Sequence, residues 1–225
     1  MASEEPMPRI VLISLSQILS SAVDKMYASF LSQLVSKATI QQVKEEKAAL
    51  RLLREDPRPS AVLITDEALA RDMLAHVWDA VLQYVRRGGT AVIMGTFPHF
   101  TSPSILEPFF AKAGLKWASN GLQKPTLVLN QEAVGSDLAA TLLPQYSQKA
   151  VSLKNVATSD AWYRPAEGSV TESPDSPPTS ANNTTETPVA FTKVGDGHLG
   201  YVGDMILLNE VSSDAVVFAM CGLSK

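Results

Sequence analysis

Four short apolar runs, each followed by a segment of helical periodicity, constrain the fold of this chain more than any other feature. The runs are Arg9–Leu15, Ala38–Val43, Ser60–Thr65 and Thr90–Gly95. Apolar residues at helical spacing follow them and predict helices that end near Ser36 and that cover Glu45–Glu55, Glu67–Arg87 and Pro103–Gly114. Fully apolar strands that alternate with helices predict a parallel sheet with helices on both faces. We therefore expect an α/β fold, a flavodoxin-like three-layer sandwich with a mostly parallel sheet.

The second half of the chain predicts shorter strands and a hairpin. Thr126–Asn130 and Val151–Val156 have the apolar character of short strands. Pro188–Val194 and His198–Gly203 flank a Gly-Asp-Gly turn, which is typical of a C-terminal β-hairpin. The last apolar run, Ala215–Cys221, fits either a strand or the start of a helix.

One segment contrasts with the rest. Residues 164–187 contain four prolines, nine serines and threonines and four acidic residues. Such a composition has too little apolar surface to pack, so we predict a flexible surface loop there. Because predicted strands resume after it and no second core is apparent, we expect residues 1–225 to form a single domain.

The composition excludes several classes of function. A net charge of −4 argues against a nucleic-acid-binding protein, which needs a basic face to neutralise phosphates. The single cysteine, Cys221, allows no internal disulfide and no cysteine-rich zinc site. No basic, apolar leader opens the sequence, and no apolar run is long enough to span a membrane. We therefore predict a cytoplasmic protein without a metal or cofactor, with a small molecule or a protein as partner and with a surface compatible with a homo-oligomer.

The fold class predicts where a functional site lies. Ligands of open α/β sheets bind beyond the carboxyl ends of the strands, where the strand order reverses. In a 2-1-3-4-5 sheet this place is between the first and third strands. The residues predicted at its rim are Ser14, Ser16, Thr65, Asp66, Glu67, Thr96, Phe97, His99, Trp162 and Asp204.

Asp66, Glu67 and His99 are the candidate catalytic residues. A carboxylate that orients an imidazole of near-neutral pKa is a common acid–base pair. The alternative is structural: Asp66 caps the helix that follows, Glu67 favours the positive end of the helix dipole, and His99 is an exposed loop residue.

Two further patterns bear on cofactors and on the predicted loop. The first strand is followed by S-L-S-Q-I-L-S-S, which has the hydroxyls of a flavin-phosphate loop but lacks its glycine. No G-x-G-x-x-G lies between a predicted strand and a helix, since the match at Gly195–Gly200 falls in the predicted hairpin, and no phosphate-binding P-loop is present, so no nucleotide or flavin cofactor is predicted. Trp162 and Tyr163 either line a pocket under the predicted loop or anchor that loop to the body.

The stretch V-x-x-Y-V-R-R-G-G-T-A-V-I-M-G (Val81–Gly95) resembles the helix–Gly-Gly–strand unit of class I glutamine amidotransferase-like folds, which include the ThuA-like proteins. Pro188–Asp204 is similar to the late hairpin of that group, and Thr65–Glu67 fits the end of its third strand. The whole chain also resembles a group of fungal proteins, a resemblance that implies no activity.

The sequence departs from the amidotransferases at their nucleophile. Those enzymes carry a cysteine on a tight strand-to-helix turn, in a G-x-C-x-G pattern, with a downstream His and Glu. Here the one cysteine closes an apolar run near the C-terminus, where a buried small hydrophobe is expected, and no H-x-E pair occurs. We therefore predict a non-catalytic small-molecule-binding or protein-interaction module. The alternative is a small-molecule enzyme, an isomerase, lyase or hydrolase, that uses Asp66, Glu67 and His99.

Overall fold

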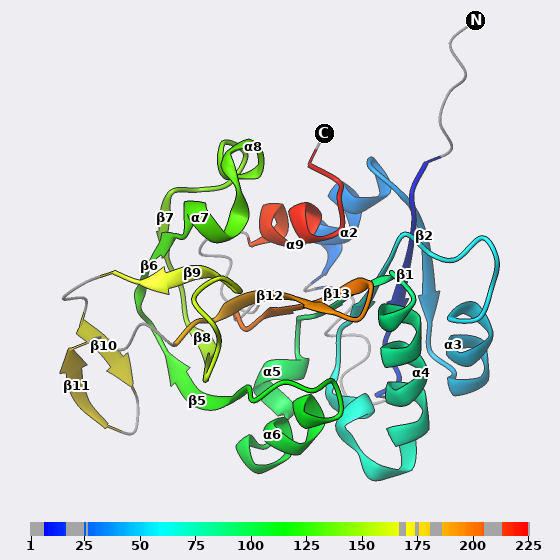
Figure 1. Cartoon of the computed structure of the whole chain (residues 1–225), viewed down its shortest axis with the longest axis horizontal. Coiled ribbons are helices and arrows are strands. Elements are labelled where there is room, and N and C mark those ends of the chain that lie inside the picture. Colours follow the sequence, from blue (N-terminus) through cyan, green and yellow to red (C-terminus); the bar gives the residue numbers. More distant parts are fainter. Residues whose placement is uncertain are drawn as a thin grey trace, which may run out of the picture.

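A nine-stranded sheet is the centre of the structure, a computed structural model that describes residues 7–16, 25, 27–166, 170–173, 176–180, 186–204 and 213–224 (Figure 1). The strand order is β2-β1-β3-β4-β13-β12-β9-β6-β7. The parallel half consists of β1 (Arg9–Ile13), β2 (Thr39–Val43), β3 (Ala61–Ile64), β4 (Thr90–Ile93) and β13 (Gly197–Val202). The order 2-1-3-4 is the one assumed for this fold class, and it places the reversal of strand order between β1 and β3. The fifth parallel strand, β13, was predicted only as part of a hairpin.

Alternate side chains of the central strands β1, β3 and β4 enter two separate cores, which makes the fold a three-layer sandwich. In β1, Val11 and Ile13 join one buried cluster while Ile10 and Leu12 join the other. The first cluster lies under α3 (Glu46–Leu52), α4 (Ala75–Arg86), α5 (Phe97–Phe100) and α6 (Pro103–Ala111). The second lies under α2 (Ala28–Val35), α7 (Gln131–Val134), α8 (Ser136–Ala139) and α9 (Asp214–Met220). The predicted α/β fold class is thereby confirmed.

The segment predicted as one helix over Glu67–Arg87 is divided, and this prediction was wrong in its first part. Two 3₁₀ turns, η1 (Glu67–Ala70) and η2 (Asp72–Leu74), precede α4. Arg71, between them, has extended backbone with φ −85° and ψ 140°, which no continuous helix accommodates. The predicted Gly-Gly ending is confirmed, because the Gly88 N–H bonds the Val85 carbonyl at 2.8 Å and Gly88 has a φ of +95°. Residues 17–24 and 26, in the first predicted helix, lie outside the described residues.

The second half of the chain adds an antiparallel extension that the sequence analysis identified only in part. Of the predicted strands, β6 (Thr126–Leu129) and β8 (Ala150–Lys154) are present, and β12 (Val189–Val194) and β13 form the predicted hairpin. Strands β5 (Ala118–Gln123), β7 (Gln145–Ser147) and β9 (Ala161–Pro165) were not predicted. The hairpin is not peripheral: β13 pairs with β4 and β12 pairs with β9. The last apolar run is the helix α9, one of the two alternatives.

The predicted loop, residues 164–187, is described only in part. Two short strands within it, β10 (Val170–Ser173) and β11 (Ser176–Ser180), pair with each other as a separate antiparallel sheet. Residues 167–169, 174–175 and 181–185 lie outside the described residues, so the predicted flexibility of this segment stays a prediction. At its end Thr187 is buried and pairs with Leu153 of β8.

Candidate functional site at the carboxyl ends of the parallel strands

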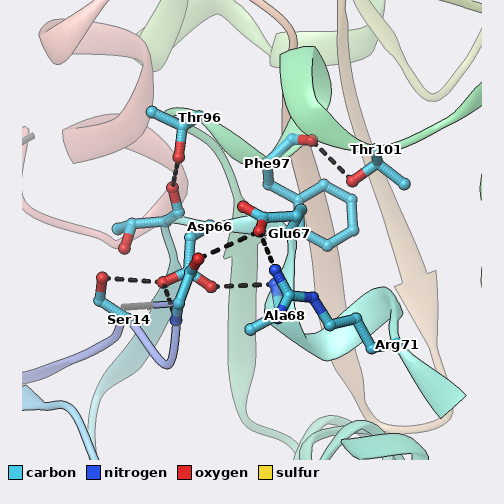
Figure 2. A network of polar contacts seen from close by, with 10 residues as sticks. Ser14, Asp66, Glu67, Ala68, Arg71, Thr96, Phe97 and Thr101 are labelled. Atoms are coloured by element: carbon cyan, nitrogen blue, oxygen red, sulfur yellow. Dashed lines mark hydrogen bonds and ion pairs between the residues drawn. The ribbon is translucent and has the colours of Figure 1, made fainter. Parts of the chain in front are cut away.

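Asp66 follows β3 and bridges to the segment that follows β1. Its Oδ2 accepts a hydrogen bond from the Ser14 hydroxyl at 2.8 Å and from the Ser16 N–H at 2.9 Å, and its Oδ1 accepts one from the Ala68 N–H at 3.0 Å (Figure 2). Asp66 is therefore the N-cap of η1, as the structural alternative predicted. It also fastens β1 to β3 at the point where the strand order reverses.

Burial raises the pKa of the Asp66 carboxyl, and the hydrogen bonds from Ser16, Ala68 and Ser14 act in the opposite direction. Glu67, the next residue, accepts a hydrogen bond from the Ser16 hydroxyl at 3.1 Å and pairs with Arg71 at 2.6 Å. Both candidate carboxylates thus already have partners within the protein.

At the carboxyl end of the neighbouring strand β4, the side chains that follow the strand contact other parts of the protein. The Thr96 hydroxyl donates to the Thr65 carbonyl at 3.0 Å, and Phe97 is fully buried against Phe109, with ring centroids 5.1 Å apart. The Thr65 hydroxyl bonds the Ile13 carbonyl at 3.2 Å. Thr65, Thr96 and Phe97, predicted as rim residues, follow the ends of β3 and β4, and their polar and apolar groups face other parts of the protein.

Tyr27 completes this edge and was not identified from the sequence. Its hydroxyl lies 3.4 Å from the Thr65 carbonyl. A Cβ at Gly95 would lie 1.5 Å from that hydroxyl, so a glycine is required there, and its φ of +74° also favours glycine. Burial raises the pKa of the Tyr27 hydroxyl above its usual range, so Tyr27 is neutral in the folded protein. No pattern in the sequence indicated this contact.

A small cavity opens beside these residues. It has a volume of about 30 Å³. Its lining residues are Leu12, Ser14, Tyr27, Leu31, Gln42, Lys44 and Thr65. A cavity of this size holds a water molecule or two but no metabolite. The predicted rim therefore exists as a place in the fold, while the cavity beside it is small.

His99 does not meet Asp66 in the described structure; it lies against Asp204, which follows β13. A hydrogen bond with the Asp204 backbone raises the pKa of His99, but burial has the larger effect and lowers it. The ring atom Nε2 is buried without a hydrogen-bond partner. Because the carboxyl ends of β4 and β13 are adjacent and parallel, the residues after these two strands meet.

Asp204 is the most deeply buried carboxyl group of this edge, with 1% of its surface exposed. The Tyr146 hydroxyl donates to its Oδ2 at 2.8 Å, and Oδ1 has no hydrogen-bond partner. Burial raises the pKa of Asp204 to about 7, although Tyr146 and the Ser213 hydroxyl oppose this shift. Sequence analysis named Asp204 as a rim residue, but no pattern indicated Tyr146 or Ser213 as its neighbours.

The remaining predicted residues have structural surroundings. Trp162, named as a rim residue, is buried in β9 and packs against Phe191 of β12, with ring centroids 4.9 Å apart. These contacts agree with the alternative in which Trp162 anchors the predicted loop to the body of the protein. Cys221 is buried at the end of α9, and burial raises the pKa of its thiol to about 12. It is thus a buried, protonated side chain, as expected.

The described part of the chain contains neither a metal-binding cluster nor a membrane-spanning helix. Within it, no group of three or more His, Cys, Asp or Glu side chains is arranged to hold a metal ion. None of the helices described here is long and apolar enough to cross a membrane.

The whole arrangement matches solved structures. A protein described as ThuA-like from Bacteroides uniformis superimposes with a TM-score of 0.63 at 11% identity, over 99% of this chain and 93% of that one. A second ThuA-like protein, from Parabacteroides merdae, gives a TM-score of 0.56 at 10% identity, over 98% and 91% of the two chains. The fold is that of the ThuA-like proteins. No family model and no curated protein sequence matches the chain, so this ThuA-like likeness concerns the fold alone.

Proposed function

We propose that this chain is a non-catalytic binding module on an amidotransferase-like scaffold and that it docks a protein partner. The observation that carries the proposal is that the described residues at the carboxyl edge of the sheet contact one another and leave little space between them. Both oxygens of Asp66 accept hydrogen bonds from the protein, Phe97 is fully buried, and the adjacent cavity measures about 30 Å³. An acid–base pair of Asp66 and His99 is not assembled, and Cys221 offers no accessible thiolate.

A groove beside this edge supports docking of a protein. A cavity of about 90 Å³ lies between the η1–η2 segment, α4 and α6, and the stacked rings of Trp78 and Phe109 form part of its wall. Two of the exposed large hydrophobic residues stand on the elements around it: Met73 on η2 and Ile105 on α6, with exposed fractions of 75% and 40%. A third, Phe100, is 53% exposed on α5, which contacts η1. Grouped exposed apolar side chains are typical of interaction sites.

The charges at the rim of this groove favour an apolar anchor. Arg71 already pairs with Glu67 at 2.6 Å, and Lys112 lies 3.4 Å from Asp79. Because these cations have acidic neighbours, they attract a charged ligand weakly. We therefore propose a partner that inserts an aliphatic or aromatic side chain between η2 and α6.

Site-specific crosslinking tests this proposal. A photoreactive phenylalanine derivative would replace Met73 or Ile105, and in a control it would replace Leu143, which is 49% exposed but lies after α8. We expect one discrete protein adduct, formed in extract of the source cells, at positions 73 and 105 and not at 143. With the identified partner purified, Met73→Glu and Ile105→Glu should each weaken binding about tenfold or more, the effect of losing a buried interface residue.

Two results would overturn the docking proposal. One is a set of adducts that is the same at positions 73, 105 and 143. The other is an affinity for the purified partner that neither glutamate substitution changes.

The enzyme alternative retains one specific observation, the unpartnered Nε2 of His99. A neutral imidazole at the strand ends is chemically competent for proton transfer. Metabolite profiling of cells that carry His99→Ala, compared with a deletion, distinguishes the two functions. A metabolite that accumulates equally in both strains supports the enzyme, whereas accumulation in the deletion alone supports the binding module.

A further inference from the structure

Asp204 stands where five separate elements meet. It follows β13, and its backbone forms a bridge with Ala150 of β8, next to the hydrogen bond from the Val151 N–H to the Gly203 carbonyl at 2.9 Å. Tyr146 of β7 donates to its carboxylate, and Ser213, the N-cap residue of α9, is a second polar neighbour. His99 of α5 bonds its backbone. Through its side chain and its backbone, Asp204 therefore joins segments that are far apart in the sequence.

The groups around the carboxyl bring no positive charge to it. Tyr146 on β7, Tyr163 on β9 and Tyr201 on β13 are the titratable side chains whose charge interaction with Asp204 is evident. A tyrosine phenol is neutral at pH 7, and burial raises the pKa of each of these three further above its usual value. His99 is also neutral at that pH, since burial lowers its pKa. An ionised Asp204 would thus be a buried carboxylate without a cation among its described neighbours.

A buried carboxylate of this kind is costly, and a proton removes the cost. Oδ2 accepts the Tyr146 hydrogen bond in either protonation state, but Oδ1 has no partner to stabilise a negative charge. We propose that Asp204 is a proton-operated latch, which in its protonated form holds β13 and α9 against the β7–β8 side of the molecule and which loosens this junction when the proton leaves. This inference is independent of the docking function proposed above.

The direction of the pH dependence follows from linkage. The pKa of Asp204 is about 7 in the folded protein, against a usual value of 3.8. Between these values the folded state holds a proton that the unfolded state has lost, so stability falls as the pH rises towards 7 and then levels off. One such proton changes the unfolding equilibrium constant by up to about tenfold per pH unit in this window.

Urea unfolding of the full chain between pH 5 and pH 8.5 tests the latch. Asp204→Asn retains an acceptor for Tyr146 and cannot ionise. We expect it to lose the fall in stability that the wild type shows, and to be more stable than the wild type at pH 8. Asp196→Asn is the matched control, because Asp196 is exposed in the turn at the other end of β13. It should retain the wild-type pH dependence.

Local exchange measurements distinguish a latch from an isolated buried acid. Hydrogen exchange at the amides of α9, corrected for the intrinsic effect of pH, should be at least tenfold faster at pH 8 than at pH 5.5 in the wild type. In Asp204→Asn the corrected rates should be equal at both pH values. Rates in α9 that do not respond to pH in the wild type would overturn the latch, even if global stability does respond.

A measurement on the wild type keeps the proposal testable if Asp204→Asn does not fold. Carbon-13 labelling of aspartate side chains should reveal one carboxyl that titrates near pH 7. Tyr146→Phe should move that midpoint to higher pH, because the Tyr146 hydrogen bond lowers the pKa of Asp204. The proposal is wrong if every aspartate titrates below pH 5, or if Asp204→Asn and the wild type share one pH dependence.

Discussion

At the scale of single residues, Asp66 shows how a carboxylate that looks catalytic in the sequence has a structural function. Its three accepted hydrogen bonds come from residues after two different strands. If Asp66 were only a helix cap, asparagine would replace it at almost no cost. The contacts with Ser14 and Ser16 change this expectation, because an amide cannot accept on both sides.

We predict that Asp66→Asn destabilises the protein by about 1–3 kcal/mol, since it leaves one buried N–H without an acceptor. Asp66→Ala should cost more, because it removes all three hydrogen bonds. Chemical denaturation monitored by circular dichroism measures both effects. Asp72→Asn, at an exposed carboxylate at the start of η2, is the control and should change stability by less than about 0.5 kcal/mol. Equal stabilities of Asp66→Asn and the wild type would contradict the bridging function.

At the scale of elements, the C-terminal end of α4 and the beginning of β13 approach each other closely. A Cβ at Gly197 would lie 2.1 Å from the Gly89 carbonyl oxygen and 2.2 Å from that of Val85. Both oxygens belong to the backbone at the end of α4, so they cannot move aside as a flexible side chain could. The glycine therefore allows the late hairpin to pair with β4 under α4.

We predict that Gly197→Ala costs about 3 kcal/mol, the upper part of the range for overpacked sites. Gly114→Ala is a suitable comparison, because no atom lies within 4 Å of the position that a methyl group would take there, and only its φ of +83° opposes alanine. That change should cost about 1 kcal/mol. Urea midpoints of the two variants provide the test, and a smaller loss at position 197 than at 114 would refute the proposed close contact.

At the scale of the whole molecule, the chain crosses from the parallel half of the sheet to the antiparallel half and then returns. Strand β13 pairs with β4, and β12 pairs with β9, although residues 94–160 separate β4 from β9 in the sequence. The C-terminal hairpin thus lies between two parts of the sheet that precede it. This arrangement supports the proposal that the chain is one domain.

Limited proteolysis tests this view and the predicted loop together. We expect the first cuts within residues 164–187, whose composition disfavours packing, and none within β3, which is fully buried. The two fragments should co-elute in gel filtration, because β12 and β13 join them through sheet hydrogen bonds. Equally fast cleavage within β3, or fragments that separate without denaturant, would contradict the single-domain arrangement.

The sequence by itself determined the first four strands of the parallel half, the Gly-Gly end of α4 and the C-terminal hairpin. It did so because apolar strands and helical periodicity are local signals that tertiary contacts here reinforce. It also placed Ser14, Thr65, Asp66, Thr96, His99 and Asp204 at one edge of the sheet.

Only the tertiary structure decided how these edge residues combine. His99 meets Asp204 and not Asp66, because β13 inserts beside β4 and brings the residues after both strands together. That insertion depends on a long-range pairing, which no local pattern encodes. The unpredicted strands β7 and β9 have the same origin: their short polar or mixed sequences become strands through pairing with β6 and β12. Burial, which decides the pKa of Asp204, likewise arises only when these elements meet.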